Sequence, residues 1–131
     1  MSGRVALKSN AFLIDTNILI YYFNGIELDE KIDEILSSSF NISIITKIEF
    51  LSWQKLYEDK ILEEKAISFI SNAKIYDLDD NIANRVIRLR QKYKIKTPDA
   101  IIGATAKQYG LAIVTNNAND FKHFDLEIVT P

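Results

Sequence analysis

The amino-acid sequence predicts an α/β fold, a three-layer α/β/α sandwich with a mainly parallel central sheet. Two observations lead to this prediction. Short apolar or β-branched runs, typical of buried strands, recur along the chain, and longer segments with apolar residues at helical spacing separate them. The 131 residues are the size of one domain, and no segment is long or polar enough to be a linker. We therefore expect a single domain over residues 1–131.

The expected strands are short and apolar. Residues 11–14 form a continuous apolar run, as a buried strand does, and residues 41–45 are rich in β-branched side chains. The later runs have the same character. In chain order, the predicted strands cover residues 11–14, 41–45, 74–78, 111–114 and 126–129.

Helices are expected in the segments between these strands. A helix after the first strand should break near Asn24-Gly25, and Gly110 should stop the last helix, which begins well with Pro98. The others are identified by apolar residues at helical spacing on one face. In chain order, the predicted helices cover residues 18–23, 29–38, 46–58, 62–71, 80–94 and 98–109.

The composition excludes several kinds of site. The net charge of −2 gives no overall basic field for nucleic acid, so such binding would need a local patch. The absence of cysteine excludes disulfides and thiolate metal sites, and the single histidine, His123, leaves little room for zinc. We expect a cytoplasmic protein, because the opening Met1-Ser2-Gly3-Arg4 lacks the apolar region of a signal peptide and no run approaches a membrane span.

Four acidic residues fall where the predicted elements would bring them together. Asp15 follows the first strand, Glu49 lies one turn into the helix after the second strand, Asp99 opens a late helix, and Asp120 follows the strand 111–114 by a short Asn-rich turn. The carboxyl ends of parallel strands share one rim, where open α/β folds bind ligands. Carboxylate oxygens suit Mg²⁺ or Mn²⁺, and such sites cleave phosphodiesters by activating water.

Each of these acids also has a purely structural interpretation. Glu49 could close a capping box that begins at Thr46, and Asp99 could complement the dipole of its helix. Asp15 could be an N-cap and Asp120 an Asx-turn residue. Taken singly, the structural interpretation is favoured for Glu49 and Asp99. Taken together, the four acids are better explained by one metal site than by four separate caps.

The residues around these acids resemble the motifs of PIN-domain ribonucleases, and more narrowly those of VapC-type toxins of toxin–antitoxin pairs. The motifs follow the family's order over nearly the whole chain: Phe12-Leu13-Ile14-Asp15-Thr16-Asn17-Ile18-Leu19, Thr46-Lys47-Ile48-Glu49, Thr97-Pro98-Asp99-Ala100-Ile101-Ile102-Gly103-Ala104-Thr105-Ala106 and Val114-Thr115-Asn116-Asn117-Ala118-Asn119-Asp120-Phe121. The resemblance implies an α/β/α sandwich and Mg²⁺- or Mn²⁺-dependent endoribonuclease activity. It also implies an antitoxin partner and frequent homodimers.

The resemblance also implies a role for individual residues. Asp15, Glu49 and Asp99 match the three core acids of the family's site. The fourth acid of the family lies at the position of Asn117 in many relatives and at that of Asp120 in others; since Asn117 is neutral, we assign this role to Asp120. The positions of Asn17, Thr115 and Asn117 match polar residues that support the metal, water or phosphate.

A basic segment precedes Asp99 and is a candidate RNA-binding surface. This segment would neutralise RNA phosphates locally, although the net charge of the chain is negative. The alternative is that the segment is only a solvated helix face. Arg85, Arg88 and Lys96 are the candidates, within a run that also holds Arg90, Lys92 and Lys94. His123 is expected to be a surface turn residue. The cluster Tyr21-Tyr22-Phe23 cannot all face inward on one helix, so part of it could contact an antitoxin segment.

Two other classes of protein remain as alternatives. A receiver-type signalling domain also gathers acids at a sheet rim, but it needs adjacent early acids and a lone acceptor Asp after the third strand, which this chain does not offer. A PIN-like module that binds RNA or protein through a degenerate site would lack core acids, whereas Asp15, Glu49 and Asp99 are all present. An RNase H-like or flap-type nuclease would need another order of elements.

Overall fold

A computed structural model describes residues 11–25 and 30–131, and these residues build one five-stranded sheet. Every pair of neighbouring strands is parallel, in the order β3-β2-β1-β4-β5. The strands are short: β1 (Phe12–Ile14), β2 (Asn41–Ser43), β3 (Lys74–Tyr76), β4 (Ala112–Val114) and β5 (Ile128–Val129). The predicted α/β fold class is confirmed.

Seven α-helices and one 3₁₀ turn connect these strands in the described part of the chain. They are α1 (Thr16–Phe23), α2 (Glu30–Ser38), α3 (Ile44–Leu51), α4 (Gln54–Glu58), α5 (Lys60–Ile70), α6 (Asp80–Lys92), α7 (Thr97–Tyr109) and η1 (Ala118–Phe121). Residues 1–10 and Asp29, on which the signal-peptide expectation and the start of the helix 29–38 rest, lie outside the described residues. No helix in the described ranges is long and apolar enough to cross a membrane.

The boundary between β2 and α3 was predicted wrongly. The β-branched run was expected to remain a strand through Ile45, but the strand ends at Ser43 and the helix begins at Ile44. The Ser43 side chain accepts a hydrogen bond from the Ile45 amide at 3.1 Å and caps the helix there, so the local cap outweighs the β propensity of the isoleucines. The predicted helix 46–58 is also divided into α3 and α4 near Ser52 and Trp53.

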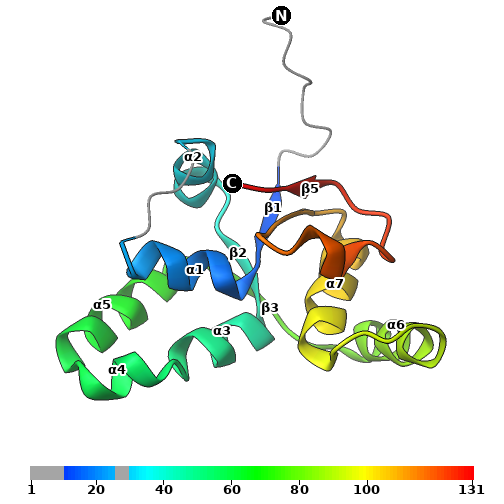
Figure 1. Cartoon of the computed structure of the whole chain (residues 1–131), viewed down its shortest axis with the longest axis horizontal. Helices are drawn as coiled ribbons and strands as arrows, with labels where there is room; N and C mark the ends of the chain where they lie inside the picture. Colours follow the sequence, from blue (N-terminus) through cyan, green and yellow to red (C-terminus); the bar gives the residue numbers. More distant parts are fainter. Residues whose placement is uncertain (1–10, 26–29) are drawn as a thin grey trace, which may run out of the picture.

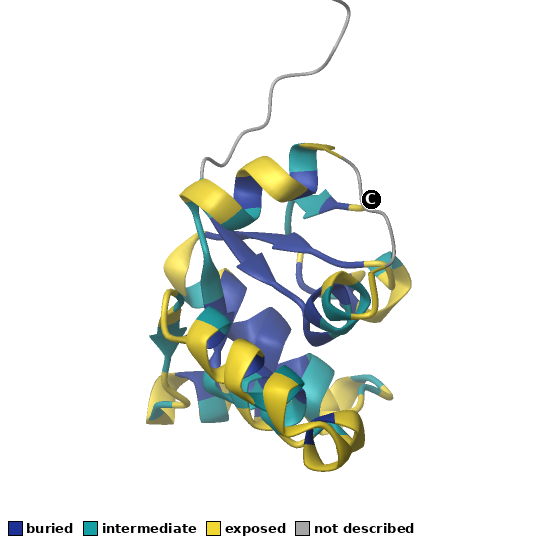
Figure 2. Ribbon diagram, turned by 90° about the vertical axis from the view of Figure 1, so that its left-hand side faces the viewer, coloured by how far each residue is buried: buried dark blue, intermediate teal, exposed yellow. Residues whose placement is uncertain are grey.

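Helices cover both faces of the sheet, which makes the three layers. Along β1, Phe12 and Ile14 pack into one hydrophobic cluster with α1, α2, α3 and α5, while Leu13 packs into a second cluster with α6 and α7. In Figure 1, α1, α3, α4 and α5 lie on one side of the strands and α6 and α7 on the other. Figure 2 shows the central strands buried and the exposed residues on the outer helices.

The strand order decides which carboxyl ends are neighbours. β1 lies between β2 and β4, with Ile14 opposite Val114, so the chain leaves both strands at adjacent points of the same rim. The Asp15 amide extends this pairing by donating to the Val114 carbonyl at 2.9 Å. A receiver-type domain has the order 2-1-3-4-5, so the observed order excludes that alternative.

Helix α7 carries Asp99 to this rim and is deeply embedded. All residues from Ala100 to Ala106 are buried, and the helix ends at Gly110, whose φ of +65° is the left-handed conformation that glycine adopts readily. Gly103 lets the helix approach the Phe124 ring, since a Cβ at this position would lie 2.5 Å from the ring carbon Cε2. This close approach fixes the segment that carries Asp120 against the helix that carries Asp99.

The aromatic cluster at the end of α1 is divided between core and surface, as predicted. Phe23 is half-buried, with its ring 5.2 Å from that of Phe50 and 5.1 Å from that of Phe69. Tyr22 is 44% exposed and stacks on Phe69 with the ring centroids 5.3 Å apart. One aromatic face of α1 is therefore accessible.

Candidate active site

Asp15 is a buried carboxyl group at the junction of β1 and α1. As the N-cap of α1, it accepts a hydrogen bond from the Thr16 amide at 2.9 Å, and it accepts a second from the Thr115 hydroxyl at 2.8 Å. Burial raises the pKa of Asp15 above its ordinary value, and the charges of Glu49 and Asp120 raise this pKa further, while the two hydrogen bonds lower it. The N-cap interpretation of Asp15 is confirmed, but the cap is held among other acids.

Glu49 does not close a capping box. Because α3 begins at Ile44, Thr46 lies inside its first turn and is not the cap residue. The Glu49 carboxylate instead accepts a hydrogen bond from the Thr16 hydroxyl at 2.7 Å, and the Thr46 hydroxyl lies 3.1 Å from the same Thr16 oxygen. This buried pair of threonines directs Glu49 towards the start of α1, next to Asp15. The sequence prediction did not identify either threonine as part of the site.

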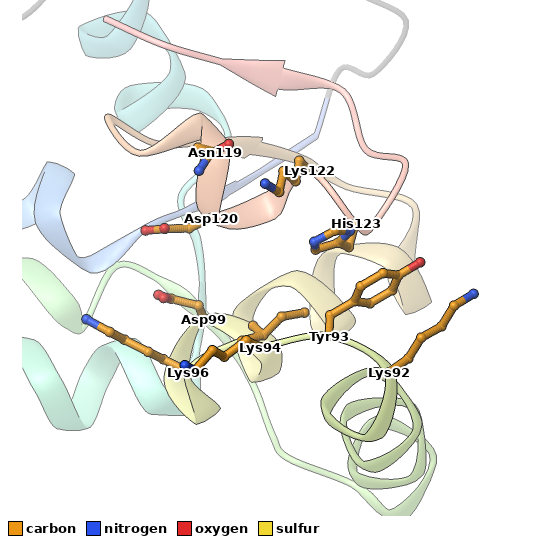
Figure 3. Close-up of a pocket in the computed structure, with 10 residues that line it drawn as sticks. Lys92, Tyr93, Lys94, Lys96, Asp99, Asn119, Asp120, Lys122 and His123 are labelled. Atoms are coloured by element: carbon orange, nitrogen blue, oxygen red, sulfur yellow. The ribbon is translucent and has the colours of Figure 1, made fainter.

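Asp99 and Asp120 complete the group of acids. Asp99 lies in the first turn of α7 and Asp120 in η1, and Figure 3 shows both carboxylates extending to the same side. Burial raises the pKa of Asp99 to about 6, with further contributions from the charges of Asp120, Asp15 and Glu49 and a smaller opposing effect of Lys96. Each of the four acids thus acts electrostatically on at least one other, so they form one electrostatic unit.

The predicted supporting residues have different surroundings. Thr115 is fully buried, donates to Asp15 and accepts a hydrogen bond from the Asn117 amide at 2.9 Å. Asn117 therefore enters this network through its backbone, and its side chain is exposed. Asn17 is half-buried in the first turn of α1, directly after Thr16.

The donor chemistry of this rim fits a hard divalent cation. All four side chains are carboxylates, and the charges of Glu49 and Asp120 raise the pKa of both Asp15 and Asp99, a cost that a bound cation would remove. In the described ranges, however, no three acidic or histidine side chains lie close enough together to form a ready-made metal site. The structure therefore brings together carboxylates that could bind a cation and that repel one another, but in the described ranges they are not spaced as a finished metal site.

The predicted basic residues belong to two neighbouring hollows. Lys96 lines a hollow of about 450 Å³ together with Asp99 and Asp120. Arg85 and Arg88 line a second hollow, of about 400 Å³, on α6, which does not include the acids. Lys92, at the end of α6, lines both hollows, so the basic run continues from one to the other, and its part from Lys92 onward lies beside the acids.

His123 lies in a turn, as expected, but it is not simply a surface residue. It is half-buried, and its ring stacks on that of Tyr93 with 3.7 Å between the centroids and 11° between the planes. Both rings line the hollow that holds Asp99 and Asp120. In the sequence, only the nearness of His123 to Asp120 along the chain indicated that His123 could lie beside the acids. No sequence feature indicated this for Tyr93.

Comparison with known proteins agrees with the four motifs. The sequence profile of the PIN domain family matches residues 12–126. A chain of a toxin–antitoxin complex from Klebsiella pneumoniae is 35% identical, with a TM-score of 0.74 over 92% of this chain and 98% of that chain. Comparison with curated proteins gives no match.

More distant solved structures share the fold. A chain of VapBC2 from Rickettsia felis, bound to a DNA fragment from their promoter, is 21% identical with a TM-score of 0.76 over 92% of this chain and 98% of that one. A chain of VapBC-1 from nontypeable Haemophilus influenzae is 18% identical, with a TM-score of 0.75 over 92% and 97% of the two chains. The family profile covers nearly all of the sheet and all four acids at its rim. The chain therefore belongs to the PIN domain family.

Proposed function

We propose that this PIN domain is a metal-dependent endoribonuclease and the toxin of a VapBC-type toxin–antitoxin pair, acting on RNA in the cytoplasm. The observation that carries the proposal is the gathering of four carboxylates at one rim, where burial first, and then the charges of Asp120, Asp15 and Glu49, raise the pKa of Asp99 to about 6. Carboxylates that are held together although they repel one another are typical of a site that works with a bound cation. Membership of the PIN domain family supports the same assignment.

Asp15, Glu49, Asp99 and Asp120 would hold Mg²⁺ or Mn²⁺ through their oxygens. When bound, such a cation polarises the phosphate and activates a water for attack on phosphorus. The chain's own residues orient the donors: the Thr16 amide and the Thr115 hydroxyl hold the two oxygens of Asp15, and the Thr16 hydroxyl holds Glu49. Lys96 places a positive charge beside Asp99, where a backbone phosphate would approach.

An antitoxin partner is proposed from the relatives and from the exposed apolar side chains. Three of the similar solved chains come from a toxin–antitoxin complex and from VapBC complexes. On this chain, Tyr22 of α1 is 44% exposed and Ile48 of α3 is 55% exposed, and α1 packs on α3. An amphipathic segment of an antitoxin could cover these side chains, and we further propose that the toxin forms a homodimer.

The nuclease proposal is tested with Asp15→Asn. Asparagine keeps an oxygen for the Thr16 amide, so the fold should persist, while the negative charge that would hold a cation is lost. Because changes in the surroundings of metal ligands already cost about 10–100-fold, we expect Mg²⁺-dependent RNA cleavage to fall by more than about 100-fold. Asp99→Asn should behave in the same way.

Glu64→Gln is the matched control, because it removes one acidic charge from an exposed position on α5, and Glu64 is not among the charges that shift the pKa of Asp15 or Asp99. It should leave cleavage unchanged. Full cleavage by Asp15→Asn, in preparations free of contaminating nuclease, would overturn the proposal. If the unmodified protein binds RNA without cleaving it, the alternative of a binding module with a degenerate site is favoured. The lack of a ready-made metal site in the described ranges agrees with that alternative.

A further inference from the structure

A lysine-rich hollow extends from the carboxylates, and the part of it beyond Lys96 has no role in the site described so far. Its volume of about 450 Å³ is within the range of pockets that hold small ligands. Asp99 and Asp120 line one end of the hollow, and Tyr93 and His123 line the other (Figure 3). A molecule bound in the hollow would therefore reach from the carboxylates to the two rings.

The two rings stack face to face, which leaves only the outer face of each ring for a further contact. The imidazole of His123 and the phenol of Tyr93 are nearly parallel, with 3.7 Å between the ring centroids. Tyr93 follows the end of α6 and is held there by its amide, which donates to the Leu89 carbonyl at 2.7 Å. His123 is held by the buried Phe124 that follows it and packs against Gly103. Contacts within the fold thus anchor the backbone that carries each ring, and the two rings stack on each other.

The hollow also carries unneutralised positive charge. Four lysines line it: Lys92, Lys94, Lys96 and Lys122. In the part of the chain that the structure describes, none of the four takes part in an ion pair within 4.0 Å; the two pairs found there involve Lys60 and Lys107. Lys92 lies over the Tyr93 ring, with its Nζ 5.3 Å from the ring centroid, and Asp99 and Asp120 offset part of the charge. The four lysines still outnumber these two acids, and in a chain of net charge −2 this excess of positive charge at one opening favours an anionic ligand.

We propose that the lysine-rich hollow is a subsite for one unpaired nucleotide, next to the phosphodiester that the carboxylates cleave. The base packs on the Tyr93–His123 stack, and the lysines neutralise the adjoining phosphates. This inference rests on the proposed function and makes it more specific. A base inside a duplex would first have to be unpaired and unstacked at a cost in free energy, so the subsite favours RNA that is single-stranded at this position.

The single histidine of the chain provides a direct test, because His123 gives the only imidazole resonances in a proton NMR spectrum. We titrate the full chain with adenosine 5′-monophosphate in EDTA, and in parallel with inorganic phosphate. A stacked adenine should move the His123 Hε1 resonance upfield through its ring current, whereas phosphate should not. Equal shifts with both ligands, or no shift with either, would overturn the subsite.

Variants of the tyrosine separate stacking from folding. Tyr93→Leu should weaken binding of the nucleotide at least about fivefold, the lower limit for loss of one base–aromatic stack. Tyr93→Phe keeps the ring and should restore binding. Tyr109→Leu is the matched control, since Tyr109 is also paired with an aromatic ring, that of Tyr76 at 4.6 Å, but does not line the hollow. Loss of binding in Tyr109→Leu to the same extent would contradict the proposal.

The same samples distinguish failure of this inference from failure of the proposed function. Cleavage is measured with Mg²⁺ on a single-stranded RNA and on the same RNA in a duplex. Cleavage without a nucleotide-specific shift of His123 would refute the subsite and leave the nuclease assignment standing. A nucleotide-specific shift without cleavage by the unmodified protein would refute the nuclease assignment and leave a nucleotide-binding hollow.

Discussion

Replacing Asp99 with asparagine should stabilise the metal-free protein at neutral pH. In the folded chain, burial and the charges of Asp120, Asp15 and Glu49 raise the pKa of Asp99 from 3.8 to about 6. At 1.36 kcal/mol per pKa unit, this shift corresponds to about 3 kcal/mol of lost stability once the group is ionised. Asp99 is partly exposed, so solvent screening reduces the figure to about half. The substitution also removes a favourable charge from the first turn of α7, which lowers the stability by about 0.3–1 kcal/mol. The net gain in the free energy of unfolding is therefore about 1 kcal/mol.

The sign of this effect depends on pH. Because the folded pKa of Asp99 lies above the unfolded value of 3.8, the folded state binds the proton more tightly between these limits. The stability that protonated Asp99 contributes is therefore present at low pH and is lost as the pH rises from about 4 through about 6. The difference between the variant and the unmodified protein should be largest at pH 7.5 and should shrink at pH 4.5.

The assay is thermal or urea unfolding in EDTA at both pH values, with Glu64→Gln as the control. For a chain of this size, about 1 kcal/mol corresponds to a rise in Tm of about 3–5 °C for Asp99→Asn at pH 7.5. Added Mg²⁺ should reverse the order, since a cation that binds only the folded protein stabilises the chain with the intact carboxylates more. A variant that is less stable than the unmodified protein at pH 7.5 in EDTA would refute the reasoning.

Two further predictions concern the segment after β4 and its contact with α7. Asp120→Ala should weaken Mn²⁺ affinity more than Asn117→Ala, because the charge of Asp120 acts on both Asp15 and Asp99 whereas Asn117 contacts Thr115 through its backbone; the reverse order in a Mn²⁺ titration would reassign the fourth acid. Gly103→Ala should lower the free energy of unfolding by about 1–3 kcal/mol, because its Cβ would lie 2.5 Å from the buried Phe124 ring. Chemical unfolding measures this change, Phe124→Leu in the same chain should restore part of it, and an unchanged midpoint for Gly103→Ala alone would exclude the clash.

The features that were predicted correctly from the sequence are local ones. A buried run such as residues 12–14, a proline at a helix start and Gly110 at a helix end act through neighbours along the chain, so the α/β class and most elements could be predicted from them. For the same reason, the positions of Asp15 and Asp120 after strands, and of Asp99 at a helix start, were visible in the sequence. Competition between two local signals caused the error at Ser43, where a cap outweighed β propensity.

The sequence by itself determined which acids could form the site, and the tertiary structure decided how they are connected and which other residues contact them. The order β3-β2-β1-β4-β5 places β1 beside β4, so that Thr115 can donate to Asp15, a contact between residues far apart in the chain. The contact of Thr16 with Glu49 and the stack of Tyr93 on His123 have the same character. Such contacts depend on how strands and helices pack, and no periodicity or spacing along the chain encodes them.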